Sequence, residues 1–334
     1  MHISFCIITY GNNLSYVRNA VRSIHEYAND LNYEIIIIDN NSTDLTFQKI
    51  KKEFPTVRIL RNEVNIGYAP GMNMAIKNST GKYIMCMSMD AELLDGSVQS
   101  LIAFMEKNPK CGLAGPRMVN HDNEVLTSMH HPNMLLSVWA EIVPLKSWLR
   151  KSRFIRKILT NLIPNSSGLT SDYYTTQMVD VLSGGILLTT RKFIDEAGYL
   201  DENFPLGPDD YDLCLRSKQN GYQNWFVAES QMIHGQKPKE NVFSLNPVYL
   251  YIRLPALLYF HSKHNNKISF MVFKWSILLL LLKWKVQISR KLGRNSKEYR
   301  ILLKSEELCS KVENYKSMIR KGWYSEFQKI MVSF

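Results

Sequence analysis

The run ISFCIIT (residues 3–9) is followed at once by YGNN (residues 10–13). A continuous apolar run closed by a polar turn predicts a strand that is buried on both faces. A second run, EIIII at residues 34–38, ends in Asp39 and further small polar residues. Between the two, apolar residues recur at intervals of three and four from Leu14 to Ala28, which is typical of an amphipathic helix. This strand–helix–strand order favours a parallel sheet.

The same alternation continues through the first half of the chain. Further strands are predicted at 57–60 and 83–87, with a helix near 71–78. Continuous apolar strands separated by helices indicate an α/β fold with a sheet covered on both faces. In such sheets, ligands bind beyond the carboxyl ends of the strands. Polar residues gather at those ends: Thr9, Asp39 and Asp90.

The second half is less regular. The segment 135–176 is predicted to be an insertion, and the chain from residue 241 onward to be helical. Between these two parts, the sequence predicts strands at 179–190 and 222–228 and helices at 191–197 and 212–219.

The basic charge is concentrated in the C-terminal part. Residues 241–334 hold 17 Lys and Arg against 5 acidic residues, and the whole chain has a net charge of +11. Lysine and tryptophan flank an apolar run at 268–282, which is shorter than the ~20 residues needed to cross a bilayer. We expect either a helix that lies on an anionic membrane or a packing helix with a charged rim. No nucleic-acid-binding module accompanies the charge, so we expect no nucleic-acid partner.

The five cysteines are widely spaced, without a disulfide or zinc pattern. Such a set favours free thiols in a reducing compartment. The N-terminal apolar run is too short for a secretory signal. We therefore expect a cytoplasmic protein that contacts the inner face of the cell membrane.

Seven short motifs occur in a fixed order. They are IITY (7–10), IDNNSTD (38–44), NIGYAPGMN (65–73), MSMDAEL (87–93), SGG (183–185), DDYDLC (209–214) and IH (233–234). Over residues 3–240 this series resembles glycosyltransferase family 2, especially its rhamnosyltransferase-like branch. The resemblance implies a GT-A fold, which is a mostly parallel Rossmann-like sheet flanked by helices. It also implies two halves, a nucleotide-sugar half at 1–112 and an acceptor half at 113–240. The basic residues 241–334, which the sequence predicts to be helical, follow as an extension.

The predicted donor site draws on the first half. A carboxylate at a strand end can accept a hydrogen bond from the ring N–H of uracil or thymine, and Asp39 matches the family position that does so. Asp39 also suits a helix cap. Three residues, Asn65, Gly67 and Gly71, would let backbone approach a ligand, although an ordinary turn needs the same residues. The resemblance adds Thr9, Tyr10 and Ser88 to the site, and implies a UDP- or dTDP-sugar donor.

The resemblance also implies a divalent cation, Mg²⁺ or Mn²⁺, that neutralises the diphosphate. Asp90 matches the last position of the family's DXD metal motif. Ser88 stands where the first acidic residue is usual, and this departure puts tight metal binding in question. His234 matches a histidine that completes the site, although a single histidine is more often structural.

The catalytic carboxylates are predicted in the motif that begins at Asp209. The resemblance aligns Asp210 with the general base, and Asp209 with its usual glutamate neighbour. A run of acidic residues also favours the start of a helix. The acceptor is expected over Ser183, Gly184 and Gly185.

Together these features predict an inverting glycosyltransferase. The resemblance implies transfer of a sugar such as rhamnose to a lipid-linked saccharide in bacterial surface polysaccharide (O-antigen or capsule) synthesis. A nicotinamide-dependent dehydrogenase is set aside, because the turn after the first strand lacks the GxGxxG fingerprint. The other alternative is a GT-A scaffold that binds without turnover, for which Ser88 is the main argument.

Overall fold

A computed structural model describes residues 2–11, 13–42, 46–130, 172–204, 207–235 and 253–310. The chain divides into two compact units. The first comprises Met1–His130, Thr170–Pro205 and Asp209–Lys239, and the second comprises His131–Leu169, Leu206–Pro208 and Glu240–Phe334. Most of the predicted insertion, 135–171, lies outside the described residues, as do 241–252 and 311–334 of the predicted tail.

The first unit alternates strands and helices, and it contains the strands predicted at 3–9, 34–38, 57–60 and 83–87. Its elements are β1 (His2–Thr9), α1 (Leu14–Tyr27), β2 (Asn32–Asp39), α2 (Thr46–Glu53), β3 (Arg58–Arg61), α3 (Tyr68–Lys77), β4 (Tyr83–Ser88), β5 (Ala91–Leu93), α4 (Ser97–Lys107), β6 (Cys111–Val119), β7 (Met129–His130), β8 (Gln177–Met178), β9 (Val181–Leu182), β10 (Ile186–Thr190), α8 (Arg191–Ala197), α9 (Asp209–Gln219) and β11 (Gln223–His234).

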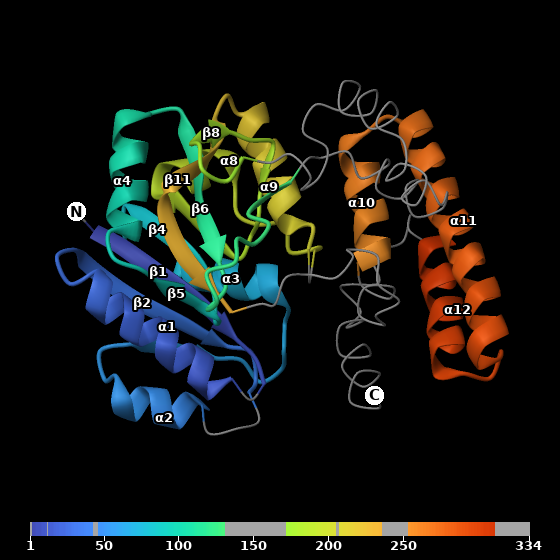
Figure 1. Ribbon diagram of the computed structural model, residues 1–334, viewed down its shortest axis with the longest axis horizontal. Helices are drawn as coiled ribbons and strands as arrows, with labels where there is room; N and C mark the ends of the chain where they lie inside the picture. The colour runs from blue at the N-terminus through green and yellow to red at the C-terminus, as the bar shows by residue number, and fades with distance from the viewer. Residues whose placement is uncertain are drawn as a thin grey trace. The chain divides into compact units, whose positions relative to one another are not determined.

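A mixed sheet forms the centre of this unit (Figure 1), with strand order β3-β2-β1-β4-β10-β6-β11-β5 and with β8 beside β11. Strands β1 to β4 are mutually parallel, as expected. Strand β10 runs antiparallel to both β4 and β6. An antiparallel strand begins at the edge where its parallel neighbours end, so the turn that enters β10 lies beside the end of β4. This mixed sheet with flanking helices confirms the predicted α/β class.

Both faces of the sheet are buried. In β1, Phe5 and Ile7 belong to one apolar cluster, which also contains residues of α1, α2 and α4. The alternate residues Cys6 and Ile8 belong to a second cluster, with α3, α8 and α9. This two-sided burial explains why the strands read as continuous apolar runs. All five cysteines are free and buried, as expected from their spacing.

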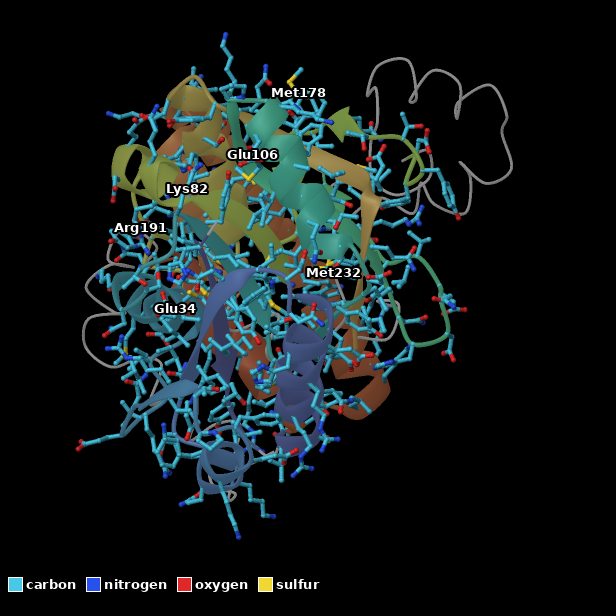
Figure 2. All side chains as sticks on the ribbon, turned by 90° about the vertical axis from the view of Figure 1, so that its left-hand side faces the viewer. Glu34, Lys82, Glu106, Met178, Arg191 and Met232 are labelled. Carbon is cyan, nitrogen blue, oxygen red and sulfur yellow. The ribbon has the colours of Figure 1, made fainter. Side chains whose placement is uncertain are left out.

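Polar contacts stabilise one edge of the sheet. This edge lies opposite the carboxyl ends of β1, β2 and β4. Glu34 accepts hydrogen bonds from the hydroxyl groups of Ser4 and Thr80. Arg191, at the start of α8, donates to the backbone oxygens of Ile76 and Ser79. Figure 2 labels Glu34 and Arg191 among the side chains of this unit. These contacts tie α3 and α8 to the sheet from the side that does not carry the motifs.

Two predicted strands differ from the structure. The single strand expected at 179–190 is wrong, because the turn at Ser183–Gly185 separates β9 from β10. The strand expected at 222–228 is too short, since β11 continues to His234 by pairing with β5, where His234 lies opposite Ala91.

Three helices form the described part of the second unit: α10 (Leu254–His264), α11 (Lys267–Leu292) and α12 (Lys297–Ser310). Helix α11 contains the apolar run predicted at 268–282, and it packs against both α10 and α12. Among the described helices, none has the combined length and apolar character that a bilayer crossing requires.

Candidate active site

The sheet brings the first predicted site residues to one edge. Thr9 and Asp39 lie opposite each other where β1 and β2 end, and Ser88 closes β4 on the other side of β1. The side chain of Thr9 is buried and its hydroxyl donates to the sulfur of Met89. Tyr10, one residue later, is 46% exposed. The edge therefore offers buried polar groups beside an exposed aromatic ring.

The two carboxylate oxygens of Asp39 have different surroundings. Oδ1 accepts a hydrogen bond of 2.9 Å from the backbone N–H of Ser42, which is a contact within the loop after β2, since helix α2 begins only at Thr46. Oδ2 is buried and accepts no hydrogen bond. Arg61, the last residue of β3, holds its Nε 3.5 Å from Oδ2 and donates to the backbone oxygen of Ser42. A buried oxygen without a hydrogen bond is uncommon, and it fits a donor supplied by a ligand.

The motif at 65–73 shapes the turn into α3. The backbone N–H of Gly67 donates to Asn65 Oδ1, and Gly67 has a φ of +96°, which favours glycine. Asn40 donates from Nδ2 to the backbone oxygen of Gly67, so the turn is fixed to the end of β2. Gly71 lies on the sheet side of α3, where a Cβ would come within 2.4 Å of Ile8 Cδ1. Close packing of α3 on β1 therefore accounts for Gly71 without a ligand.

Ser88, Asp90 and His234 form one cluster. His234 Nε2 lies 3.0 Å from Ser88 Oγ and 3.6 Å from Asp90 Oδ1. The next residue, Gly235, donates its backbone N–H to the backbone oxygen of Asp90. The pairing of β11 with β5 thus brings together two residues that are far apart in the sequence. The side chain of His234 is 9% exposed and that of Asp90 is 14% exposed.

A divalent cation fits this cluster as a partial site. Two ligands of one octahedral ion with bonds of about 2.1 Å lie roughly 3 Å apart, which is close to the observed His234–Asp90 distance of 3.6 Å. Carboxylate and imidazole are both ligands of such ions. Within the described residues, no group of three or more His, Cys, Asp or Glu side chains is placed to hold a metal. The described residues thus offer two ligands, and waters or ligand oxygens fill the remaining positions of such an ion.

The turn at Ser183–Gly185 lies between this cluster and Asp210. The backbone N–H of Gly184 donates to Asp210 Oδ2 at 3.0 Å, and Ser88 donates its backbone N–H to the oxygen of Gly185. A Cβ on Gly184 would lie 3.0 Å from Asp210 Cβ, and one on Gly185 would lie 2.9 Å from His234 Nε2. Both glycines are therefore required by close contact, and the turn connects Asp210 to His234.

Two further groups hold this turn. The phenol of Tyr68, in α3, donates to the backbone oxygen of Gly184 at 2.9 Å. Burial, with added repulsion from Cys86 and from the carboxylates of Asp209 and Asp210, raises the pKa of Tyr68 well above its usual value. The phenol therefore remains a hydrogen-bond donor across the ordinary pH range. On the other side, the backbone N–H of Ser183 donates to the oxygen of Ser128.

The three acidic residues at the start of α9 differ in their roles. Asp212 is buried and pairs with Arg216 at 2.8 Å, which makes it structural. Asp209 is also buried, with 4% of its surface exposed. The carboxylate of Asp210 contacts the glycine turn through Oδ2, and its Oδ1 accepts a hydrogen bond from the backbone N–H of Tyr211. The ring of Tyr211 in turn stacks on His130 of β7, with centroids 5.7 Å apart.

Comparison with known proteins identifies the family of the chain. The model of the family described as "Glycosyl transferase family 2" matches residues 4–182. The chain belongs to glycosyl transferase family 2. The predicted resemblance to this family is thereby confirmed, and the matched residues contain the first four of the seven motifs.

Relatives within family 2 differ in what they transfer. Over 211 residues the chain is 24% identical to an N-acetylglucosaminyl-diphospho-decaprenol L-rhamnosyltransferase of Mycobacterium tuberculosis. The aligned region covers 60% of this chain and 66% of the relative. Over 91 residues it is 35% identical to a poly-beta-1,6-N-acetyl-D-glucosamine synthase of Staphylococcus epidermidis. This aligned region covers 26% of this chain and 22% of the relative. The matches thus span about two thirds of the first relative and less of the second.

Solved structures of GT-A proteins share the fold of this family 2 chain. GalNAc-T7 with UDP, GalNAc and Mn²⁺ superimposes with a TM-score of 0.56 at 15% identity, over 91% of this chain and 56% of the other. A mannosyltransferase of Pyrobaculum calidifontis with GDP-Man and Mn²⁺ gives a TM-score of 0.50 at 12% identity. The superposition covers 95% of this chain and 86% of the mannosyltransferase. These likenesses confirm the predicted GT-A fold.

Three residues of the site were missed by the sequence reasoning. Arg61 ends an edge strand, and no sequence signal says which carboxylate it meets. Tyr68 lies inside the NIGYAPGMN motif, so its place in that motif was the available signal. His130 reaches the site only through the pairing of β7 with β9, where it lies opposite Val181.

Proposed function

We propose that this chain is an inverting glycosyltransferase that uses a nucleotide-diphosphate sugar. The observation that carries the proposal is the continuous set of contacts from Asp210 through Gly184 and Gly185 to His234, Ser88 and Asp90. This set of contacts supports a catalytic carboxylate on one side of the glycine turn and a diphosphate site on the other. We assign residues 1–240 to the catalytic domain and 241–334 to a basic helical extension.

Donor recognition is proposed to begin at Asp39. Its Oδ2 lacks a hydrogen bond, and the ring N–H of a uracil or thymine base would supply one. Tyr10 is exposed at the same strand end, where an aromatic ring can pack on a base. This arrangement supports a UDP- or dTDP-sugar as the donor.

Asp90 and His234 are the residues proposed to hold a Mg²⁺ or Mn²⁺ ion. When bound, such an ion neutralises charge on the diphosphate leaving group. Ser88, which replaces an acidic residue, holds its Oγ 3.0 Å from His234 Nε2. The same nitrogen faces Asp90, so an ion bound between His234 and Asp90 would take the place of the contact between Ser88 and His234.

Asp210 is proposed as the general base. An acceptor hydroxyl attacks the anomeric carbon, its oxygen forms the new glycosidic bond, and the bond from that carbon to the diphosphate oxygen breaks. The hydroxyl proton passes to the carboxylate of Asp210. A positioned base of this kind contributes about 10²- to 10⁴-fold to the rate. Asp209, which is buried beside it, is proposed to support this group electrostatically.

The acceptor is proposed to be a lipid-linked saccharide that binds over Ser183, Gly184 and Gly185. The rhamnosyltransferase among the relatives carries a lipid diphosphate in its name, and this supports rhamnose as a candidate sugar and surface polysaccharide synthesis as the setting. The basic helices of the second unit support peripheral contact with the inner face of the membrane. The charge lies on helices without a nucleic-acid-binding module, so no nucleic-acid partner is proposed.

The test is transfer by the purified chain from a panel of UDP- and dTDP-sugars to a polyprenyl-diphosphate-linked acceptor, with Mn²⁺ or Mg²⁺. Asp210→Asn should lower turnover about 10²- to 10⁴-fold while leaving nucleotide binding intact. Asp195→Asn, on the exposed side of α8, is the matched control and should transfer normally. Equal inactivity of the wild type and Asp210→Asn with every donor would favour the scaffold alternative.

A further inference from the structure

Helix α11 has two apolar faces. One face is buried against α10 and α12, and it includes Phe273, Ile277, Leu280 and Trp284. A helix that packs on only one side normally shows a polar opposite face. Here the opposite face is apolar as well, and its side chains are exposed to solvent.

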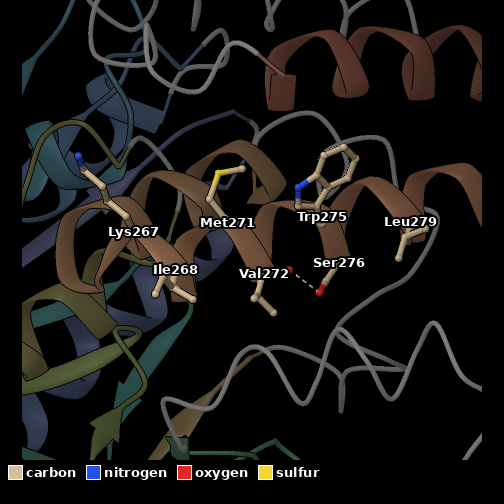
Figure 3. Close-up of a pocket in the computed structure, with 7 residues that line it drawn as sticks. All are labelled: Lys267, Ile268, Met271, Val272, Trp275, Ser276 and Leu279. Atoms are coloured by element: carbon tan, nitrogen blue, oxygen red, sulfur yellow. Dashed lines mark hydrogen bonds between the residues drawn. The ribbon is translucent and has the colours of Figure 1, made fainter.

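The exposed face is a narrow and continuous stripe, which we call the outer stripe of α11. It consists of Ile268, Met271, Val272, Trp275, Leu279 and Leu282, and it continues to Val286. At 100° per residue, these positions fall within an arc of about 100°, and they extend for about 27 Å along the axis. Ile268 is 78% exposed and Trp275 is 61% exposed. Figure 3 shows the first part of the stripe, where Trp275 and Met271 project from the helix.

The charge around the outer stripe has a single sign. Helix α11 contains six Lys and Arg and no acidic residue, and residues 253–310 hold twelve Lys and Arg against three Glu. Two of these lysines contact α12, since Lys274 donates to the oxygen of Ser310 and Lys285 pairs with Glu306. Lys267 precedes the stripe and Arg290 follows it, and both are exposed.

This pattern distinguishes among the possible occupants of the stripe. A symmetric dimer places the same patch of two copies face to face, which would bring like charges together. A membrane-spanning position would require α11 to separate from α10 and α12. An anionic lipid surface satisfies every feature at once, because apolar residues enter the acyl boundary, tryptophan lies at headgroup level and basic side chains contact phosphates.

We propose that α11 lies parallel to the membrane plane, with the outer stripe inserted into the headgroup–acyl boundary of an anionic bilayer. This deepens the proposed peripheral membrane contact by naming its surface, and it rests on that part of the proposed function. The buried face keeps α10 and α12 on the side away from the lipid. The proposed binding partner of the outer stripe is a lipid surface and not another protein.

The experiment is co-sedimentation of the full chain with vesicles. One set of vesicles is pure phosphatidylcholine, and the other is phosphatidylcholine with phosphatidylglycerol at a ratio of 3:1. The wild type should bind the anionic vesicles, and added salt should weaken the binding. Trp275→Ser with Leu279→Ser should weaken it about tenfold or more, since each 1.4 kcal/mol corresponds to a factor of ten. Leu303→Ser, an equally exposed leucine on α12, should bind as the wild type does.

A second variant tests the charge component. Lys267→Glu with Arg290→Glu should weaken binding to the anionic vesicles about tenfold and leave any binding to the neutral vesicles unchanged. Both positions are exposed, so folding is expected to persist and is checked by circular dichroism. Unchanged vesicle binding by the Trp275→Ser, Leu279→Ser variant would overturn the proposal. So would a wild type that binds no vesicles and forms dimers that this variant dissociates.

The result can be separated from the fate of the proposed function. Transfer to a water-soluble acceptor analogue needs no membrane, so it should be equal in the wild type and the stripe variant. Loss of vesicle binding with normal soluble transfer assigns the stripe to lipid and leaves the chemistry intact. Normal vesicle binding without transfer from any donor would refute the enzymatic proposal alone.

Discussion

Replacement of Asp39 by Asn should invert the base preference of the donor site. The backbone N–H of Ser42 donates to Oδ1, whereas Oδ2 accepts no hydrogen bond. An asparagine can keep its oxygen at Ser42 and place its NH₂ group where Oδ2 lies. The group that meets the base then changes from an acceptor to a donor.

The size of the effect follows from the contact that is lost. A hydrogen bond to a charged group contributes about 1.5–3 kcal/mol, which corresponds to about 10- to 150-fold in the dissociation constant. Binding of UDP and dTDP should weaken by this factor, because the ring N3 of uracil and thymine carries a hydrogen. The ring N3 of cytosine is an acceptor, so the affinity for CDP should rise relative to UDP.

Titration calorimetry with UDP and CDP at constant Mn²⁺ measures both changes. Asp95→Asn is the control, because Asp95 is exposed and lies in the loop before α4. A loss of less than threefold for UDP, with no change for CDP, would show that the base does not contact Asp39. The free oxygen of this residue would then need another explanation, such as its 3.5 Å approach to Arg61.

Two further predictions concern other parts of the chain. Gly185→Ala places a Cβ 2.9 Å from His234 Nε2, so His234 should shift and metal-dependent UDP binding should weaken about tenfold. Calorimetry should show no such loss for Gly96→Ala, where an added Cβ would meet nothing within 4 Å although the φ of +67° is one that favours glycine. Burial lowers the pKa of His261 to about 4, so the folded state keeps this ring neutral while the unfolded state gains a proton below pH ~6.5. The stabilising contribution is complete above that pH and is lost as the pH falls toward 4, by about 2–3 kcal/mol between pH 7.5 and 4.5. Urea denaturation measures the difference in unfolding free energy between the wild type and His261→Phe. This difference should change by the same amount between pH ~7.5 and ~4.5. A difference that does not depend on pH would contradict the lowered pKa of His261.

The first half of the fold was predictable because its signals are local. Residues 3–9 and 34–38 are buried on both faces of the sheet, and such strands must be apolar throughout. The turns after them hold polar residues for equally local reasons, and Asp39 accepts a hydrogen bond from Ser42 within its own loop. The position of Asp39 at the end of its strand could therefore be predicted from neighbouring residues.

The second half was less predictable because its contacts are distant in the sequence. The apolar run at Ile186–Thr190 does not indicate the direction of the strand within the sheet. Its antiparallel direction follows from its pairing with β4 and β6. The need for glycine at position 185 comes from His234, which is brought there by the pairing of β11 with β5. Arg61 meets Asp39 across two neighbouring strands, and no local pattern indicates that pair.

The strand order β2-β1-β4-β10 has a consequence for how this protein can change over evolution. Asp39 ends β2 and the glycine turn begins β10, so three inter-strand steps, about 14 Å in total, lie between them. Residues this far apart without shared partners usually contribute additively. Substitutions that alter the choice of nucleotide can therefore accumulate at one end of this row without disturbing proton transfer at the other. A lineage with this sheet can acquire a new donor while it retains its chemistry.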